Sequence, residues 1–164
     1  MPSLRSPVRC KKPVLKMITG VVFAHDAHRS SPVGVPTAVH PTQDGPANPN
    51  FPSFEAVLGT DSVVHETWVT CQDTAGREHR FLIAAQYRPE CEVNTALKRV
   101  LPEAEWRGGL IVMRGGMRAF VVNMGDSGFR TLAETAVFKF LFETAPFITA
   151  HVQQNAALNI PLRL

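Results

Sequence analysis

The stretch that says most about the fold is residues 110–134, LIVMRGGMRAFVVNMGDSGFRTLAE. An apolar run reaches Gly115-Gly116, a second apolar run follows, and Gly125-Asp126-Ser127-Gly128 then precedes apolar residues at helical spacing. Two consecutive glycines accept positive φ and favour a two-residue turn that matches the twist of the flanking strands. We therefore expect a β-hairpin in which residues 110–113 pair with residues 117–124.

A long helix is predicted to follow this hairpin. Thr131 and Glu134 form a capping box, in which both side chains bond to backbone N–H groups at the start of a helix. Apolar residues recur at helical spacing as far as Leu141, and the helix is expected to end before Pro146. The predicted helix spans about residues 131–144, and a last short helix is expected over residues 149–158.

A similar unit lies upstream. Residues 62–71 and 78–87 are separated by a turn, and Thr74-Ala75-Gly76 is a three-residue loop ending in glycine, which is typical of a hairpin. Counting back from the turn places Cys71 opposite His79, on the face expected to join the core. Helical spacing then predicts a helix of about three turns over residues 93–101, which ends at Pro102.

The order hairpin, helix, hairpin, helix (ββαββα) predicts an α+β fold, with an antiparallel sheet of four strands and helices on one face. Residues 14–24 contain good strand formers and could supply a fifth strand. The globular domain is predicted to span residues 54–158, followed by an apolar tail at residues 159–164. Six prolines between Ser30 and Ser53 disfavour a helix or an interior strand, so residues 1–53 are expected to form an extended arm.

Basic side chains are concentrated in the first part of this arm. Residues 1–29 carry six basic side chains and one acidic side chain, whereas the rest of the chain carries 11 basic and 13 acidic ones. Such an arm can neutralise phosphates on nucleic acid or on an acidic membrane without reading sequence. The basic residues that we assign to the arm are Arg5, Arg9, Lys11, Lys12 and Lys16. No apolar run approaches the ~20 residues that span a bilayer, so no transmembrane segment is expected.

The cysteines point to a reducing compartment. Cys10, Cys71 and Cys91 are an odd number, widely spaced and without a C-x-x-C pair, which is not the pattern of a secreted disulfide framework. We expect an intracellular protein, with the cytoplasm as the first choice of compartment. A mitochondrial location is the alternative, because no acidic residue precedes Asp26, although early prolines oppose an import helix.

Gly125-Asp126-Ser127-Gly128 resembles the nucleophile segment of serine proteases. The earlier histidine and aspartate and the two-barrel chain of that family are absent, so we expect Ser127 to cap a helix. Residues 121–127 also resemble the strand-end motif of metal-dependent protein phosphatases, in which the aspartate helps to organise a metal site. Those enzymes need an Asp-Gly-His-Gly segment upstream, which Asp44-Gly45-Pro46 does not match, and their activity is not carried over. The remaining hypothesis is an anion site formed by Ser127, Gly128 and Arg130 at the helix start.

A metal site is the second chemical hypothesis. Cys71 and His79 are predicted cross-strand neighbours and suit zinc, but a protein site needs three or four ligands. His65 lies six residues before Cys71, about 20 Å along the strand, and cannot reach the same ion. We therefore expect zinc to bind weakly or not at all, and no cofactor is predicted.

No Walker loop, dinucleotide fingerprint, H-E-x-x-H or recognisable nucleic-acid module is present. We predict a non-catalytic protein-binding or assembly module that self-associates or forms part of a larger complex. Its expected apolar anchors are Phe51, Phe54, Phe147, Leu158, Ile160, Leu162 and Leu164. The first alternative is a small ligand-binding or hydrolytic domain with an anion site near Asp126 and Ser127, and the second is nonspecific nucleic-acid binding by the arm. A pocket lined by Asp126, Ser127, His65 or His79 would favour the first alternative.

Overall fold

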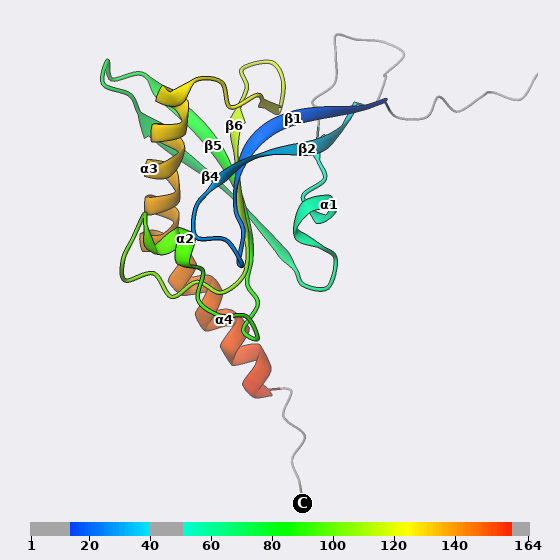
Figure 1. Ribbon diagram of the computed structural model, residues 1–164, viewed down its shortest axis with the longest axis vertical. Helices are drawn as coiled ribbons and strands as arrows, with labels where there is room; N and C mark the ends of the chain where they lie inside the picture. The colour runs from blue at the N-terminus through cyan, green and yellow to red at the C-terminus, as the bar shows by residue number, and fades with distance from the viewer. Residues whose placement is uncertain (1–13, 40–50, 159–164) are drawn as a thin grey trace, which may run out of the picture.

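A computed structural model describes residues 14–39 and 51–158, which form an α+β fold around one curled antiparallel sheet (Figure 1). The strand order is β3-β2-β1-β6-β5-β4, and β7 pairs with β6. The strands are β1 (Val14–Phe23), β2 (Ser31–Val39), β3 (Phe51–Pro52), β4 (Val64–Gln72), β5 (Glu78–Gln86), β6 (Leu110–Gly115) and β7 (Val121–Val122). The helices are α1 (Glu55–Leu58), α2 (Thr95–Lys98), α3 (Ser127–Glu143) and α4 (Ala145–Leu158). The α+β class is confirmed, but the sheet has more strands than expected and the ββαββα order is not confirmed.

Hydrophobic cores lie on both faces of the central strands. On one face, Phe81 and Val112 pack against α2, α3 and the start of α4, in a cluster that includes Leu97, Phe140 and Ala145. On the other face, the neighbouring residues Leu82 and Ile111 pack against β1, β2 and α1. Side chains alternate between the faces of a strand, so a strand with two cores must be apolar throughout. The expectation that all helices lie on one face was wrong, because α1 covers the second core.

The sheet curls where β1 leaves β6. β1 pairs with β2 along its length, but it pairs with β6 only from Val21 to Phe23. At the preceding residue, Gly20, a Cβ atom would lie 2.7 Å from the carbonyl oxygen of Val112, so a side chain would not fit there. Beyond this point Thr19 bonds instead to the segment after β7: its N–H donates to Asn123 Oδ1, and its carbonyl accepts from the Met124 N–H, both at 2.9 Å.

An aromatic cluster brings the two ends of the curled sheet together. β3 and β4 are the terminal strands in the sheet order, yet Phe51 of β3 and Trp68 of β4 both contact Phe120. The ring centroid of Phe120 lies 5.0 Å from that of Phe51 and 5.2 Å from that of Trp68. Contacts of this kind add to the free energy gained from burying the rings. The loop between β6 and β7 therefore helps to close the curl.

The two predicted hairpins have different outcomes. The β4–β5 register is confirmed, with Cys71 opposite His79 and Asp73 bonded to Arg77 across the turn. The prediction of a turn at Gly115-Gly116 was wrong. Gly115 is the last residue of β6 and pairs with Val121, so residues 116–120 connect β6 to β7. Gly115 is required by packing, because a Cβ there would lie 2.9 Å from the Trp68 ring and 3.0 Å from a backbone oxygen of Arg80.

Each predicted helix has different bounds in the structure. α3 begins at Ser127, four residues before the predicted capping box, and α4 begins at Ala145, with Pro146 in its first turn, where a missing N–H costs little. The expected helix over residues 93–101 was wrong, since α2 contains only four residues. Asn94 is the N-cap of α2, and its buried side-chain oxygen accepts a hydrogen bond from the Leu97 N–H. Its side-chain nitrogen donates to the carbonyls of Phe23 and Gly108.

The extended arm is not confirmed, because its described residues 14–39 form β1 and β2 of the same sheet. The Pro36 carbonyl accepts a hydrogen bond from Ser53 N at 2.8 Å, on the side of β2 away from β1. In an antiparallel strand the N atom of a residue faces the same side as its carbonyl, so the Pro36 nitrogen also faces away from β1. Pro32, four residues earlier, has the same orientation. Neither proline therefore removes a bond between β1 and β2. In the described ranges, no helix is both long and apolar enough to cross a membrane.

Candidate functional site

An open groove of about 750 Å³ lies between the β4–β5 turn and the first turns of α3. Asp73 and Arg77 contribute from the turn, His79 from β5 and Arg114 from β6. Asp126 and Phe129 contribute from the start of α3. The groove brings together three separate stretches of the chain, and it contains His79 and Asp126, two of the residues expected to mark a ligand site.

Asp73 organises the turn side of the groove. One carboxylate oxygen, Oδ2, lies 2.9 Å from His79 Nε2 and accepts from Arg77 Nε at 2.9 Å. The other oxygen accepts from the backbone N–H groups of Ala75 and Arg77. His79, followed by the bonds from Arg77 and Ala75, holds the pKa of Asp73 well below its usual range. Asp73 is therefore an ionised, fully bonded carboxylate that fixes the positions of His79 and Arg77.

Arg114 and His79 flank the ring of Phe129. The guanidinium carbon of Arg114 lies 3.5 Å from the ring centroid, and the imidazole of His79 meets the ring edge-on at 5.3 Å. A guanidinium that stacks on an aromatic face gains a cation–π interaction and keeps its N–H groups pointing outward in the plane. Among the described residues, none accepts a hydrogen bond from the Arg114 guanidinium or forms an ion pair with it. Its donors are therefore free for a ligand.

The start of α3 corrects our expectation for Ser127. Asp126 is the N-cap, and its Oδ1 accepts from the N–H groups of Gly128 at 3.0 Å and Phe129 at 3.3 Å. Ser127 is the first helical residue and does not cap the helix. The Asp126 carboxylate therefore accepts hydrogen bonds from the N–H groups that were expected to bind an anion. Arg130 lines a separate, smaller cavity with Val21, whereas Gly128 lines the groove.

Cys71 and His79 are neighbours, as expected, but their side chains have different surroundings. The Cys71 thiol is buried in the core beneath α3, and this burial raises its pKa. His79 contacts Asp73 and faces the groove. Across residues 14–39 and 51–158, no group of three or more potential ligands is placed to hold a metal ion. The zinc hypothesis therefore has two candidate ligands, Cys71 and His79, and no third among the described residues.

The expected apolar anchors are divided between surface and core. Phe147 and Leu158 on α4 are largely exposed and Phe51 is half-exposed, whereas Phe54 is buried in the second core. Ile160, Leu162 and Leu164 lie outside the described residues, as do Arg5, Arg9, Lys11 and Lys12. Lys16 is exposed on β1.

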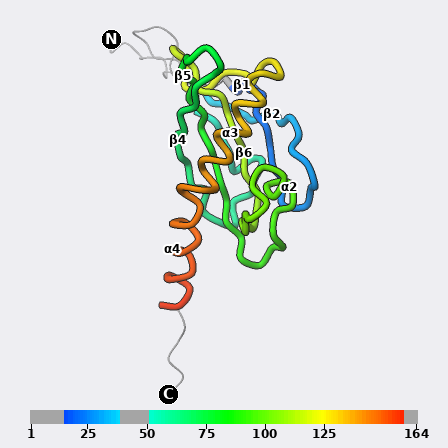
Figure 2. The backbone as a smooth tube through the Cα atoms, turned by 90° about the vertical axis from the view of Figure 1, so that its left-hand side faces the viewer, coloured from blue at the N-terminus to red at the C-terminus, as the bar shows by residue number. Residues whose placement is uncertain are grey.

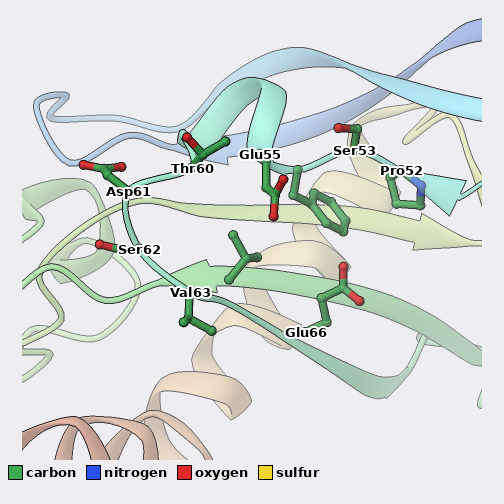
Figure 3. Close-up of a pocket in the computed structure, with 10 residues that line it drawn as sticks. Pro52, Ser53, Glu55, Thr60, Asp61, Ser62, Val63 and Glu66 are labelled. Atoms are coloured by element: carbon green, nitrogen blue, oxygen red, sulfur yellow. The ribbon is translucent and has the colours of Figure 1, made fainter.

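A second open cavity, of about 690 Å³, lies between α1 and β4. Glu55 and Glu66 enter it from opposite sides, and Figure 3 shows their carboxylates pointing toward the space between the two elements. Asp61 at its edge pairs with Arg88, which also bonds to the carbonyl of Leu58 and the side chain of Gln86. Arg88 therefore closes the α1–β4 loop, and within residues 14–39 and 51–158 no cation forms an ion pair with Glu55 or Glu66.

The residues that matter most in the first groove were not identified from the sequence. Arg114 was expected to face Met117 across the Gly115-Gly116 turn, and Phe129 preceded the expected helix. The available signal was the single charge at Arg114 within the apolar run LIVMRGG, since a strand buried on both faces seldom carries an unpaired charge. No known protein family, curated protein or solved structure matches the chain.

Proposed function

We propose that the protein is a non-catalytic assembly module, and that a second copy of the chain binds the outer surface of α3 and α4. The observation that supports this proposal most strongly is the composition of α4, whose 14 residues include no Asp, Glu, Lys or Arg. The described surface of this helix is nevertheless mostly exposed, with Ala145 as its only buried residue. Exposed surfaces of soluble proteins usually carry many charges, whereas the centres of protein interfaces are depleted of them.

The position of α4 supports the same proposal. α4 continues from the end of α3 and projects past the sheet (Figures 1 and 2). Ala145, Ile148 and Val152 of α4 pack on the first core, and no residue of α4 after Val152 joins that cluster. Helices shorter than about 12–15 residues are marginal in water without tertiary packing. Contact with a second chain would supply the packing that the far half of α4 lacks.

Exposed aromatic side chains extend this surface onto α3. Phe138 and Phe142 stack with their rings 6.2 Å apart and nearly parallel, and their side chains are 42% and 68% exposed. On α4, Phe147 is 76% exposed and Leu158 is 82% exposed. Exposed apolar side chains of this size are commonly covered by association, because removing them from water lowers the free energy.

The experiment is a concentration series by light scattering on the full chain. We expect the wild type to have the mass of a dimer at high concentration, and the double variant Phe142→Glu/Phe147→Glu to have the mass of a monomer, because each glutamate would place a charge in the interface. Met117→Glu is the matched control, since Met117 is a fully exposed apolar residue on the β6–β7 connection. Circular dichroism checks that all variants are folded. A wild type that stays monomeric throughout would contradict the proposal.

A further inference from the structure

The groove between the β4–β5 turn and α3 contains one guanidinium group, that of Arg114, that makes no hydrogen bond or ion pair with a described residue. Arg77 and His79 contact Asp73, and the Asp126 carboxylate bonds two N–H groups at the start of α3. Arg114 is the groove's remaining charged side chain, half-buried against Phe129, and no described residue supplies it with an acceptor. In the open groove the Arg114 donors face solvent, and a carboxylate could take the place of water there with two charge-assisted hydrogen bonds.

We propose that this groove binds a small organic carboxylate, with Arg114 holding the carboxylate and the apolar part of the ligand lying against Phe129 and Leu132. This site is independent of the assembly surface. The planar guanidinium fork matches a carboxylate in a bidentate arrangement, and stacking on Phe129 fixes the plane in which the ligand must approach. The carboxylates of Asp73 and Asp126 also line the groove, so a monoanionic carboxylate is repelled less than a dianionic phosphate.

The shape and lining of the groove limit the size of the ligand. Its volume of about 750 Å³ lies in the range of small-molecule sites, and it is open to solvent along one side. Phe129 and Leu132 supply apolar contact, and Thr131 and Thr135 direct their hydroxyl groups back to helix carbonyls. Because those hydroxyls are occupied, charge and apolar contact dominate recognition. An aromatic or branched carboxylate fits this combination better than acetate.

Arg80 offers a matched control on the other face of the sheet. Its guanidinium also lies over an aromatic ring, that of Trp68, at 4.8 Å, but it donates to the carbonyl of Gly116 and does not line the groove. Arg80→Gln and Arg114→Gln therefore remove the same kind of cation–π pair. They differ in whether the arginine faces the groove with free donors.

The test is a titration of the full chain followed by amide chemical shifts, with benzoate, the neutral isostere benzamide, and acetate as probes at matched ionic strength. We expect benzoate to shift the amides of Gly128 and Phe129 saturably. Benzamide, which lacks the charge, and acetate, which lacks the ring, should bind roughly tenfold more weakly or worse. Arg114→Gln should weaken benzoate binding by a similar factor, and Arg80→Gln should change it by less than about twofold.

The wild-type probes keep the proposal testable if Arg114→Gln fails to fold. Equal binding of benzamide or acetate, benzoate binding that survives Arg114→Gln, or no saturation with benzoate would each overturn it. A monomeric wild type that binds benzoate through Arg114 would refute the assembly proposal and leave this one standing. A dimer that ignores benzoate would do the reverse.

Discussion

Asp73 Oδ2 lies 2.9 Å from His79 Nε2, across the turn that joins β4 to β5. The same oxygen accepts from Arg77 Nε, so one carboxylate connects the two ends of the turn and orients two groove residues. These bonds lower the pKa of Asp73 and thereby couple its ionisation to folding. The hairpin and the groove consequently share a dependence on pH.

We predict that Asp73→Asn is less stable than the wild type at neutral pH and that this difference narrows in acid. A carboxyl group whose pKa is lower in the folded than in the unfolded state stabilises the fold at pH values above its unfolded pKa, about 3.9. This stabilisation is lost as the pH falls from there toward the folded pKa. Urea unfolding at pH 7, 5 and 3 measures the difference, with the exposed Glu90→Gln as the control. An Asp73→Asn difference that stays constant over this range would show that ionisation plays no part.

The N-cap prediction separates two adjacent residues. Asp126→Ala should lower the free energy of unfolding by about 1 kcal/mol, because the N–H groups of Gly128 and Phe129 lose their acceptor. Ser127→Ala should change it by less than about 0.5 kcal/mol, since within the described chain its hydroxyl makes no hydrogen bond. Urea denaturation of the two variants under one condition decides between them. Equal losses would restore Ser127 as a cap.

Gly20 tests the point at which the sheet curls. Gly20→Ala should destabilise the protein by about 1–3 kcal/mol, because the added methyl group would meet the Met113 side chain and the Val112 carbonyl. Gly34→Ala on the paired strand is the control: its methyl group would meet only the flexible end of Met17, so we expect a change within about 1 kcal/mol. Thermal unfolding followed by circular dichroism measures both. Similar losses at the two positions would argue against a close β1–β6 approach.

The sequence predicted the features that depend on short-range geometry. The three-residue loop at Thr74-Ala75-Gly76 set the β4–β5 register, and with it the pairing of Cys71 with His79, because a turn of known length fixes which residues pair. The α3 helix was predicted from its apolar spacing, although its start was misplaced. Asp126 and Thr131 both have side chains that can cap a helix, and local pattern alone does not rank them.

The features decided by the tertiary structure depend on partners that lie far apart in the chain. Pro32 and Pro36 were read as signs of an arm, and they fit a strand only because their missing N–H groups face away from β1. Gly115 was read as a turn, and packing against Trp68 and Arg80 places it in a strand. The groove likewise exists only because β6 brings Arg114 onto Phe129 of α3. Periodicity along a chain records which face of an element is apolar, and it carries no information about which distant element will cover that face.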